Sequence, residues 1–313
     1  MKASVLPVLF LGLLTLCSCA QHVTPAPSPL PRFGHVFIVV EQDHGFETVI
    51  GNPVMPYFNR LASQYVTLTN YSADSGLSFD NSLFLSTGAG SSDVPYFGKR
   101  LYFRDNIVRE LSGAGMTWKS YNESLPRVGY TKEEGFNAPY VKRHNPFPYF
   151  ADVWLRPSER AHIVPFSQFP KDLANDALPQ YSWIVPSSLH NAHMENCPED
   201  KPVCTDSDRL AAADAWLKDN IAPLIASPIF QKDGLLIIVF DDREGNKPGR
   251  VPALIVSPFA KRGYKSATPA GHESALRLMA EGLRLQSFPG AASKANNLSD
   301  CFVSEAAAKR QIH

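Results

Sequence analysis

The chain has 313 residues, of which 44% are hydrophobic, so it can bury the core of one large domain or of two small ones. Its 30 basic and 30 acidic residues give a formal net charge of zero. Dedicated nucleic-acid-binding proteins usually carry a basic excess, so this balance argues against that class and no nucleic-acid partner is expected.

The first residues have the pattern of an export signal. Lys2 precedes an apolar run over residues 6–16 that is too short to span a bilayer with margin. The run ends in Leu-Cys-Ser-Cys-Ala, which is similar to a bacterial lipobox with Cys19 as the lipidated residue; an ordinary cleaved signal peptide is the alternative. We therefore predict a lipoprotein signal over residues 1–19, a proline-rich tether over 20–34 and a single domain over 35–313. The protein would be exported, in the periplasm or at the outer membrane, with an N-terminal lipid anchor in the membrane.

Strand and helix patterns then alternate along the chain. Apolar runs typical of strands occupy residues 35–40, 66–71, 117–121, 163–165, 181–185, 235–240 and 251–257. Helical spacing of apolar residues occupies residues 55–64, 106–114, 207–225 and 273–283, and residues 81–87 are expected to form the first turns of a further helix. Residues 129–150 are rich in aromatic residues and proline, which predicts a long structured loop or a small cap. The alternation predicts a three-layer α/β/α sandwich with a mostly parallel central sheet.

Acidic residues follow two of the most apolar predicted strands. The strand at 35–40 runs into Glu41, Gln42 and Asp43, and the strand at 235–240 runs into Asp241 and Asp242. Sites in open α/β sheets gather beyond the carboxyl ends of the strands, where oxygen donors from two loops can hold one divalent metal ion. The alternative is that these acids cap the next helix or turn.

Ser78 precedes the predicted helix at 81–87. A hydroxyl at the start of a helix lies in the positive end of the helix dipole, among backbone amides without intrahelical partners. That is a favourable place for a nucleophile that attacks phosphorus, because developing negative charge is stabilised there. The alternative is a serine that only caps the helix.

Three cysteines remain after the predicted processing at Cys19. Cys197 and Cys204 flank a short polar loop, which in an oxidising compartment predicts a local disulfide. A zinc site that includes His193 is the alternative. Cys301 has no predicted partner.

Several stretches in the same order resemble the bacterial phosphoesterase family of acid phosphatases and phosphatidylcholine-type phospholipases C, within the alkaline-phosphatase-like superfamily. They include VVEQDHGFETVIGN, NYSADSGLSFDNSLFLSTG, YVKRHNPFPYF and LLIIVFDD, and they extend over nearly all of residues 35–290. The resemblance implies an alkaline-phosphatase-like fold, a catalytic domain over residues 35–313 and metal-dependent hydrolysis of phosphate esters.

The resemblance also implies roles for individual residues. It makes Ser78 the nucleophile and assigns a divalent metal ion to Gln42, Asp43, Asp241 and Asp242. It places near the substrate phosphate Asn81, His44, His144, His193, Arg250 and His272.

The sequence departs from the family pattern at several of these positions. The family's Glu-Asn pair is Gln42-Asp43, a swap that keeps one carboxylate and one amide. Gly76 replaces a histidine, and Arg250 stands where the family has another histidine, so Arg250 is expected to bind the phosphate in its place.

Two alternative functions follow from these departures. The first is a surface lipoprotein that has lost catalysis and binds a phosphorylated ligand or an envelope partner; it predicts a Ser78 that lies well away from Asp241. The second is a sulfatase-like or phosphonate-directed relative, but no sulfatase maturation motif follows Ser78.

Overall fold

The computed structural model describes residues 30–92, 101–134, 138–193, 197, 203–243, 245 and 247–303. Cys19 and the predicted signal lie outside these ranges. Within them, no helix is both long enough and apolar enough to cross a membrane.

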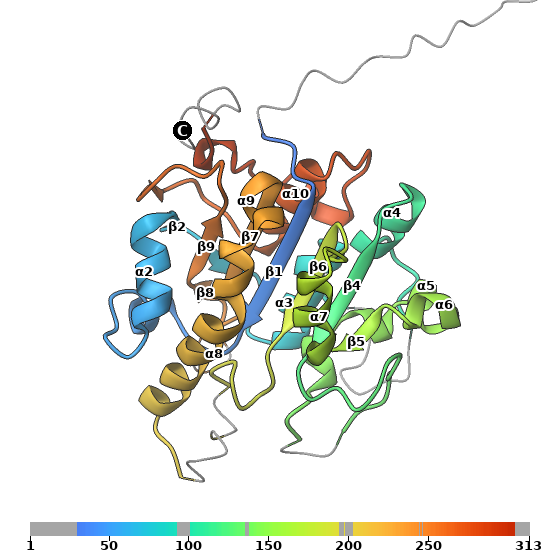
Figure 1. The fold of residues 1–313 in the computed structure, drawn as a ribbon, viewed down its shortest axis with the longest axis horizontal. Helices are drawn as coiled ribbons and strands as arrows, with labels where there is room; N and C mark the ends of the chain where they lie inside the picture. The colour runs from blue at the N-terminus through green and yellow to red at the C-terminus, as the bar shows by residue number, and fades with distance from the viewer. Residues whose placement is uncertain are drawn as a thin grey trace, which may run out of the picture.

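An eight-stranded sheet forms the centre of the molecule, in the order β10-β2-β9-β7-β1-β6-β4-β5 (Figure 1). Its strands are β1 (His35–Glu41), β2 (Val66–Leu68), β4 (Trp118–Asn122), β5 (Ile163–Pro165), β6 (Tyr181–Val185), β7 (Gly234–Phe240), β9 (Ala253–Val256) and β10 (Lys265–Ser266). Only β9 runs antiparallel to its neighbours, so the prediction of a mostly parallel sheet is confirmed. A separate two-stranded sheet pairs β3 (Ser72–Ala73) with β8 (Gly249–Arg250).

The central strands β1 and β7 are buried almost throughout, which explains their unbroken apolar sequences. They pair in parallel from His35 opposite Gly234 to Glu41 opposite Phe240. Because the two strands end in register, the residues that follow them, 42–43 and 241–242, leave the sheet side by side. The register therefore brings together two acidic segments that are about 200 residues apart in sequence.

Helices cover both faces of the sheet, which gives the three layers that the sequence predicts. In Figure 1, α7, α8 and α9 cross the near face, and α3 and α10, which contact each other, lie behind the sheet. The longer helices are α2 (Pro56–Gln64), α3 (Ser78–Thr87), α4 (Ile107–Gly113), α7 (Phe169–Ala174), α8 (Asp206–Ala226), α9 (Pro228–Asp233) and α10 (His272–Gly282). Short helices are α1 (Phe46–Val49), α5 (Ala151–Trp154), α6 (Pro157–Arg160), η1 (Lys142–His144), η2 (Phe147–Tyr149), η3 (Phe166–Gln168), η4 (Gly290–Ser293) and η5 (Ser299–Cys301).

Helix α3 begins at Ser78, earlier than the start near residue 81 that the sequence predicts. Its N-cap, Leu77, makes no side-chain capping bond, so the usual polar start signal is missing. The helix ends at Gly88, whose φ of 65° is the left-handed conformation that glycine adopts without strain. Ser78 is therefore the first helical residue and not a residue of the preceding loop.

The stretch just before β1 packs against the domain. Leu30 and Phe33, which composition assigns to the tether, are both 2% exposed. The Phe33 backbone N–H donates to the Gly282 carbonyl at 3.1 Å, and its ring lies 5.5 Å from that of Phe302. Residues 30–34 thus belong to the folded body, because two apolar side chains among the prolines find a place in the core.

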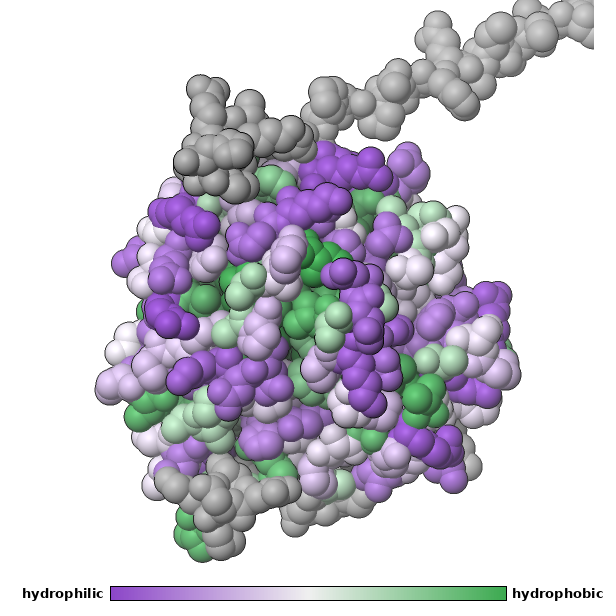
Figure 2. Space-filling view, viewed as in Figure 1, coloured by the Kyte–Doolittle hydropathy of each residue, from purple (hydrophilic) through white to green (hydrophobic). Residues whose placement is uncertain are grey.

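The covered sheet leaves a largely polar exterior on the face seen in Figure 2, where hydrophilic residues predominate and apolar ones lie in small areas between them. Ahead of α8, a disulfide joins Cys197 to Cys204 with 5.5 Å between their Cα atoms. Cys301 is a buried free thiol.

Candidate metal centre and nucleophile

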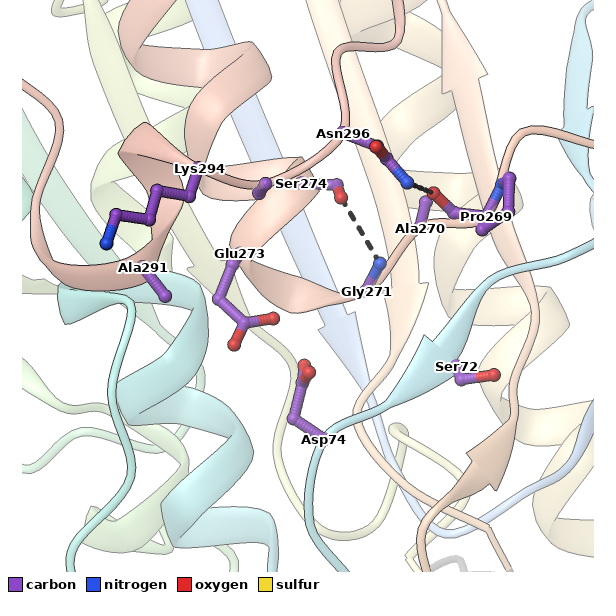
Figure 3. Close-up of a pocket in the computed structure, with 11 residues that line it drawn as sticks. Ser72, Asp74, Pro269, Ala270, Gly271, Glu273, Ser274, Ala291, Lys294 and Asn296 are labelled. Carbon is purple, nitrogen blue, oxygen red and sulfur yellow. Dashed lines mark hydrogen bonds between the residues drawn. The ribbon is translucent and has the colours of Figure 1, made fainter.

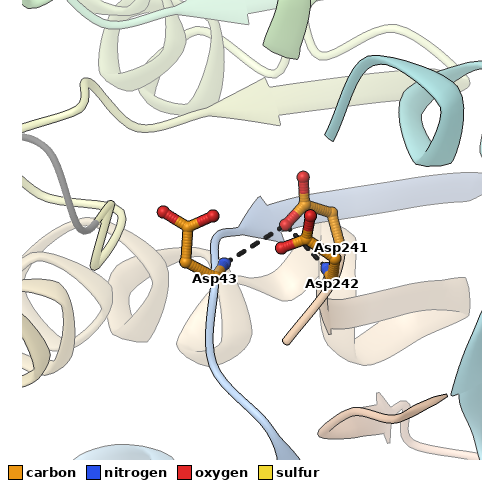
Figure 4. A group of neighbouring side chains, drawn as sticks. All are labelled: Asp43, Asp241 and Asp242. Carbon is orange, nitrogen blue, oxygen red and sulfur yellow. Dashed lines mark hydrogen bonds between the residues drawn. The ribbon is translucent and has the colours of Figure 1, made fainter. Parts of the chain in front are cut away.

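Three buried aspartates meet beyond the ends of β1 and β7. Ligand oxygens of Asp43, Asp241 and Asp242 all lie within 4.8 Å of one another (Figure 4). Two backbone N–H groups hold the Asp241 carboxylate: that of Asp242 donates to Oδ1 at 2.8 Å and that of Asp43 at 3.4 Å. Below, we call these three residues the aspartate triad.

Asp43 joins the triad through an unusual backbone conformation. Its φ is +61°, in the left-handed region, which aspartate and asparagine tolerate better than other residues with a side chain. The family's Asn and this chain's Asp both suit that conformation. With Gln42-Asp43 in place of the family's Glu-Asn, the carboxylate belongs to the residue with the left-handed backbone, whose N–H donates to Asp241.

Gln42 is fully buried beside this turn. Its backbone N–H donates to the Asn191 carbonyl at 2.9 Å. Neither Oε1 nor Nε2 of its side chain has a hydrogen-bond partner within the described part of the chain. A buried amide in that state is unfavourable by roughly 1–3 kcal/mol, which is consistent with a position that serves a ligand.

Electrostatics in the triad are unfavourable to three ionised groups. Burial, followed by repulsion from Asp43, raises the pKa of Asp241. Burial, followed by repulsion from Asp241 and Asp43, raises the pKa of Asp242. A bound divalent cation would reverse this effect, and closely spaced carboxylate oxygens are the donors that hard cations such as Mg²⁺, Mn²⁺ or Ca²⁺ accept. The geometry and chemistry of the triad therefore fit a divalent metal ion.

Ser78 lies beside the triad. Its side chain interacts with the Asp241 carboxylate and lowers the pKa of that group, against the effect of burial. As the first residue of the ten-residue helix α3, it also lies among the amides of the helix N-terminus. Ser78, the predicted nucleophile, thus lies near Asp241, one of the predicted metal ligands.

Asn81, expected near the substrate phosphate, is engaged with the loop before the helix. Its Oδ1 accepts from the Ser75 backbone N–H at 3.0 Å, and its Nδ2 donates to the Ser75 carbonyl at 2.9 Å. Both ends of the amide are thus used by the chain itself. Asn81 fixes the turn that leads into Ser78.

His193 and His144 lie on the other side of Asp43. The Nδ1 atom of His193 is 3.7 Å from Asp43 Oδ2, and the two imidazole rings are 5.3 Å apart. Burial is the main cause that lowers the pKa of His144, and its Nε2 has no partner among the described residues. The Nε2 of His144 can therefore contact a ligand at the triad, whereas His193 contacts Asp43 itself.

His272 and His44 support the site from within the protein. The His272 Nε2–H donates to the Asp241 carbonyl at 2.7 Å, and its Nδ1 accepts from the Tyr71 hydroxyl at 2.8 Å. Burial lowers the pKa of His272 to about 4, so the ring is neutral. The His44 Nδ1–H donates to the Gln42 carbonyl at 3.1 Å, and its ring packs against Phe240. His272 thus holds the Asp241 backbone with Nε2 and contacts Tyr71 with Nδ1, which differs from the predicted substrate contact.

Arg250 lies at the surface, on the short strand β8. It pairs with Glu47, lies over the Phe46 ring at 4.3 Å and donates to the Thr69 carbonyl at 3.2 Å. These contacts differ from the predicted phosphate contact. The β3–β8 pairing, which motif position alone does not show, directs the side chain toward α1.

Sequence reasoning missed three residues that support the site. Tyr71 and Asp74 both hold His272, Asp74 by accepting from its backbone N–H at 2.9 Å. Asp74 also faces Glu273 in a cavity of about 420 Å³ that Lys294 helps to line (Figure 3). The third is Arg143, whose Nη2 lies 3.0 Å from His193 Nε2. Its only sequence signal is its position just before His144.

Similar proteins are known from both sequence and structure. A probable acid phosphatase of Kluyveromyces lactis is 29% identical over 256 residues, which are 78% of this chain and 56% of that protein. A phosphatidylinositol-3-phosphatase of Mycobacterium tuberculosis is 28% identical over 247 residues, 78% of this chain and 75% of that protein. The chain thus spans little more than half the length of the first relative and three quarters of the second.

Solved structures show the same fold at low identity. A protein of the alkaline phosphatase superfamily from Vibrio parahaemolyticus aligns with a TM-score of 0.56 and 16% identity over 82% of this chain and 68% of that one. A phosphonate monoester hydrolase of Agrobacterium radiobacter aligns with a TM-score of 0.54 and 14% identity over 80% and 74%. The predicted alkaline-phosphatase-like fold is confirmed. Because the model of the Phosphoesterase family matches residues 49–285, three quarters of the chain, this protein belongs to the Phosphoesterase family.

Proposed function

We propose that the protein is a metal-dependent hydrolase of phosphate esters that uses Ser78 as its nucleophile. The observation that carries the proposal is the interaction of Ser78, at the start of α3, with Asp241 of the aspartate triad. The activities named for the two relatives, acid phosphatase and phosphatidylinositol-3-phosphatase, support the same reaction class.

In this mechanism the Ser78 Oγ forms a bond to phosphorus while the bond from phosphorus to the leaving alcohol oxygen breaks. The Asp241 carboxylate, whose pKa the Ser78 side chain lowers, would receive the hydroxyl proton. A divalent ion held by the triad and the Gln42 amide would act as a Lewis acid and lower the pKa of the serine hydroxyl. The amides at the start of α3 and the imidazole of His144, whose Nε2 has no partner among the described residues, stabilise the phosphoryl oxygens. Water then hydrolyses the phosphoserine and restores Ser78.

The test is hydrolysis of p-nitrophenyl phosphate and bis-p-nitrophenyl phosphate, with and without a chelator. Ser78→Ala is expected to lower kcat by at least about a thousandfold, because the covalent route is lost. Ser82→Ala is the matched control: Ser82 lies one turn further along α3, and its hydroxyl has no partner within the described residues. Equal inactivity of the wild-type protein and Ser78→Ala across metals and pH would favour the binding-only alternative.

We also propose that the protein is exported to the periplasm or outer membrane and anchored by a lipid on Cys19. The lipobox-like sequence and the disulfide between Cys197 and Cys204 support export, since disulfides persist in oxidising compartments. Cys19→Ala is expected to move the protein from the membrane fraction to the soluble fraction, whereas Cys17→Ala leaves it anchored. Intact-mass measurement distinguishes lipidation from simple cleavage.

A further inference from the structure

Three side chains from separate segments form a line into the aspartate triad. Arg143 comes from η1, His193 from the loop after β6 and Asp43 from the loop after β1. Arg143 Nη2 lies 3.0 Å from His193 Nε2, and His193 Nδ1 lies 3.7 Å from Asp43 Oδ2. The chain of contacts therefore runs from a cation through an imidazole to a carboxylate that is a candidate metal ligand.

The order of these groups determines where the imidazole carries its proton. A guanidinium has only N–H donors and remains charged in proteins, so Nε2 of His193 must accept from Arg143. The ring proton then resides on Nδ1, the nitrogen that faces Asp43. The opposite tautomer would set two donors against each other at Nε2 and a lone pair against the carboxylate at Nδ1.

The surroundings keep the ring in this position. The His193 side chain is 5% exposed, and its backbone N–H donates to Asn191 Oδ1 at 3.1 Å. Residue Ala192, between them, has a φ of 65°, which turns the chain sharply before His193. On the other side, η1 contacts α3, the helix that begins at Ser78.

We propose that Arg143 is a positioning residue for the metal centre: it fixes His193 so that the Nδ1–H faces Asp43 and holds that carboxylate toward Asp241 and Asp242. The inference rests on the metal dependence in the proposed function and extends it to a residue outside the ligand set. When a group that contacts and orients a metal ligand without binding the metal is removed, metal affinity typically falls about ten- to a hundredfold. Arg143, and not Arg250, is thus the arginine that serves the site.

The experiment measures Mn²⁺ binding to the mature protein by isothermal titration calorimetry, so it does not depend on activity. Arg143→Met, which keeps the side-chain length but has no donor, is expected to weaken binding about ten- to a hundredfold. Arg143→Lys keeps a charged donor and is expected to recover part of the affinity. Arg250→Met is the matched control and is expected to bind Mn²⁺ as the wild-type protein does.

A double-mutant cycle with His193→Ala separates positioning from a general effect on folding or charge. If Arg143 acts through His193, Arg143→Met causes no further loss of Mn²⁺ affinity in the His193→Ala background. Three results would overturn the proposal. Arg143→Met could weaken Mn²⁺ binding as much in the His193→Ala background as in the wild-type background, Arg143→Met could bind Mn²⁺ as tightly as the wild-type protein, or the wild-type protein could bind no Mn²⁺. Thermal melting followed by circular dichroism checks that each variant folds. If Arg143→Met does not fold, the same cycle is measured with Arg143→Lys.

The outcome is separable from that of the proposed function. Mn²⁺ binding that follows the expected cycle, in a protein that hydrolyses neither nitrophenyl substrate, would retain the role of Arg143 and reject the hydrolase. Hydrolysis that depends on Ser78 but is unaffected by metals would retain the hydrolase and reject the role of Arg143.

Discussion

The aspartate triad predicts opposite effects of one substitution on stability with and without metal. Asp241→Asn keeps the shape of the side chain and an oxygen that can accept from the Asp43 and Asp242 amides, but removes one buried negative charge. Because the folded-state pKa of Asp241 is raised, the stability linked to its protonated form is present at low pH and is lost as pH rises through that pKa. At pH 8 without metal, the wild-type protein therefore carries a destabilising charge that the variant lacks.

The magnitudes follow from linkage. Burial and the Asp43 charge raise the pKa of Asp241 from 3.8 to about 7, and each unit corresponds to about 1.4 kcal/mol, so the metal-free variant is expected to be more stable by about 4 kcal/mol at pH 8. In the wild-type protein, a metal ion at a hundred times its Kd adds about 2.7 kcal/mol. For a domain of this size that corresponds to a rise in Tm of roughly 5–11 °C. Asp241→Asn should lose most of this rise.

The assay is thermal unfolding at pH 8, followed by circular dichroism, in EDTA and in excess Mn²⁺. Asp219→Asn, an exposed aspartate on α8, is the control and should behave as the wild-type protein does in both conditions. A variant that melts below the wild-type protein in EDTA, or that gains as much from Mn²⁺, would refute the reasoning about the triad.

Three further substitutions test other parts of the site and fold. The turn before Ser78 depends on Asn81, so Asn81→Ala should lower kcat on p-nitrophenyl phosphate about ten- to a hundredfold with little change in KM, whereas a residue that bound substrate would raise KM. Burial, then interaction with Asp74, raises the folded-state pKa of Glu273 from 4.5 to about 7, so its contribution to stability is present below pH 4.5 and lost toward pH 7. Between pH 5 and pH 8, the free energy of unfolding measured in urea should therefore fall more for the wild-type protein than for Glu273→Gln, by on the order of 1 kcal/mol after solvent screening. An equal change in both proteins would contradict this. In Gly88→Ala, the new Cβ would lie 2.5 Å from the Pro289 carbonyl oxygen at a φ of 65°, so urea unfolding should show a loss of at least about 2 kcal/mol.

The sequence was informative where local pattern and chain order suffice. Two continuous apolar strands followed by acids predict a buried parallel pair with carboxylates at its end, and β1 and β7 form that pair. Strand polarity alone explains why Asp43, Asp241 and Asp242 meet, since parallel strands in register end at the same edge. The family pattern added Ser78, which no periodicity would have selected from other serines.

Tertiary packing decided which polar side chains face the site and which support it. Motif position placed Asn81, His272 and Arg250 near the phosphate, but each contacts other residues of the chain. Asn81 bonds to Ser75, His272 to Tyr71 and Asp241, and Arg250 to Glu47 and Thr69.

The sequence by itself determined the layers, the acidic corner and the candidate nucleophile, because each depends on strand order and on short contiguous motifs. The tertiary structure alone decided that residues 30–34 join the core and that Arg143 reaches His193. Side-chain direction in loops depends on contacts with segments far apart in sequence, such as the 50 residues that separate Arg143 from His193, and no local pattern encodes it.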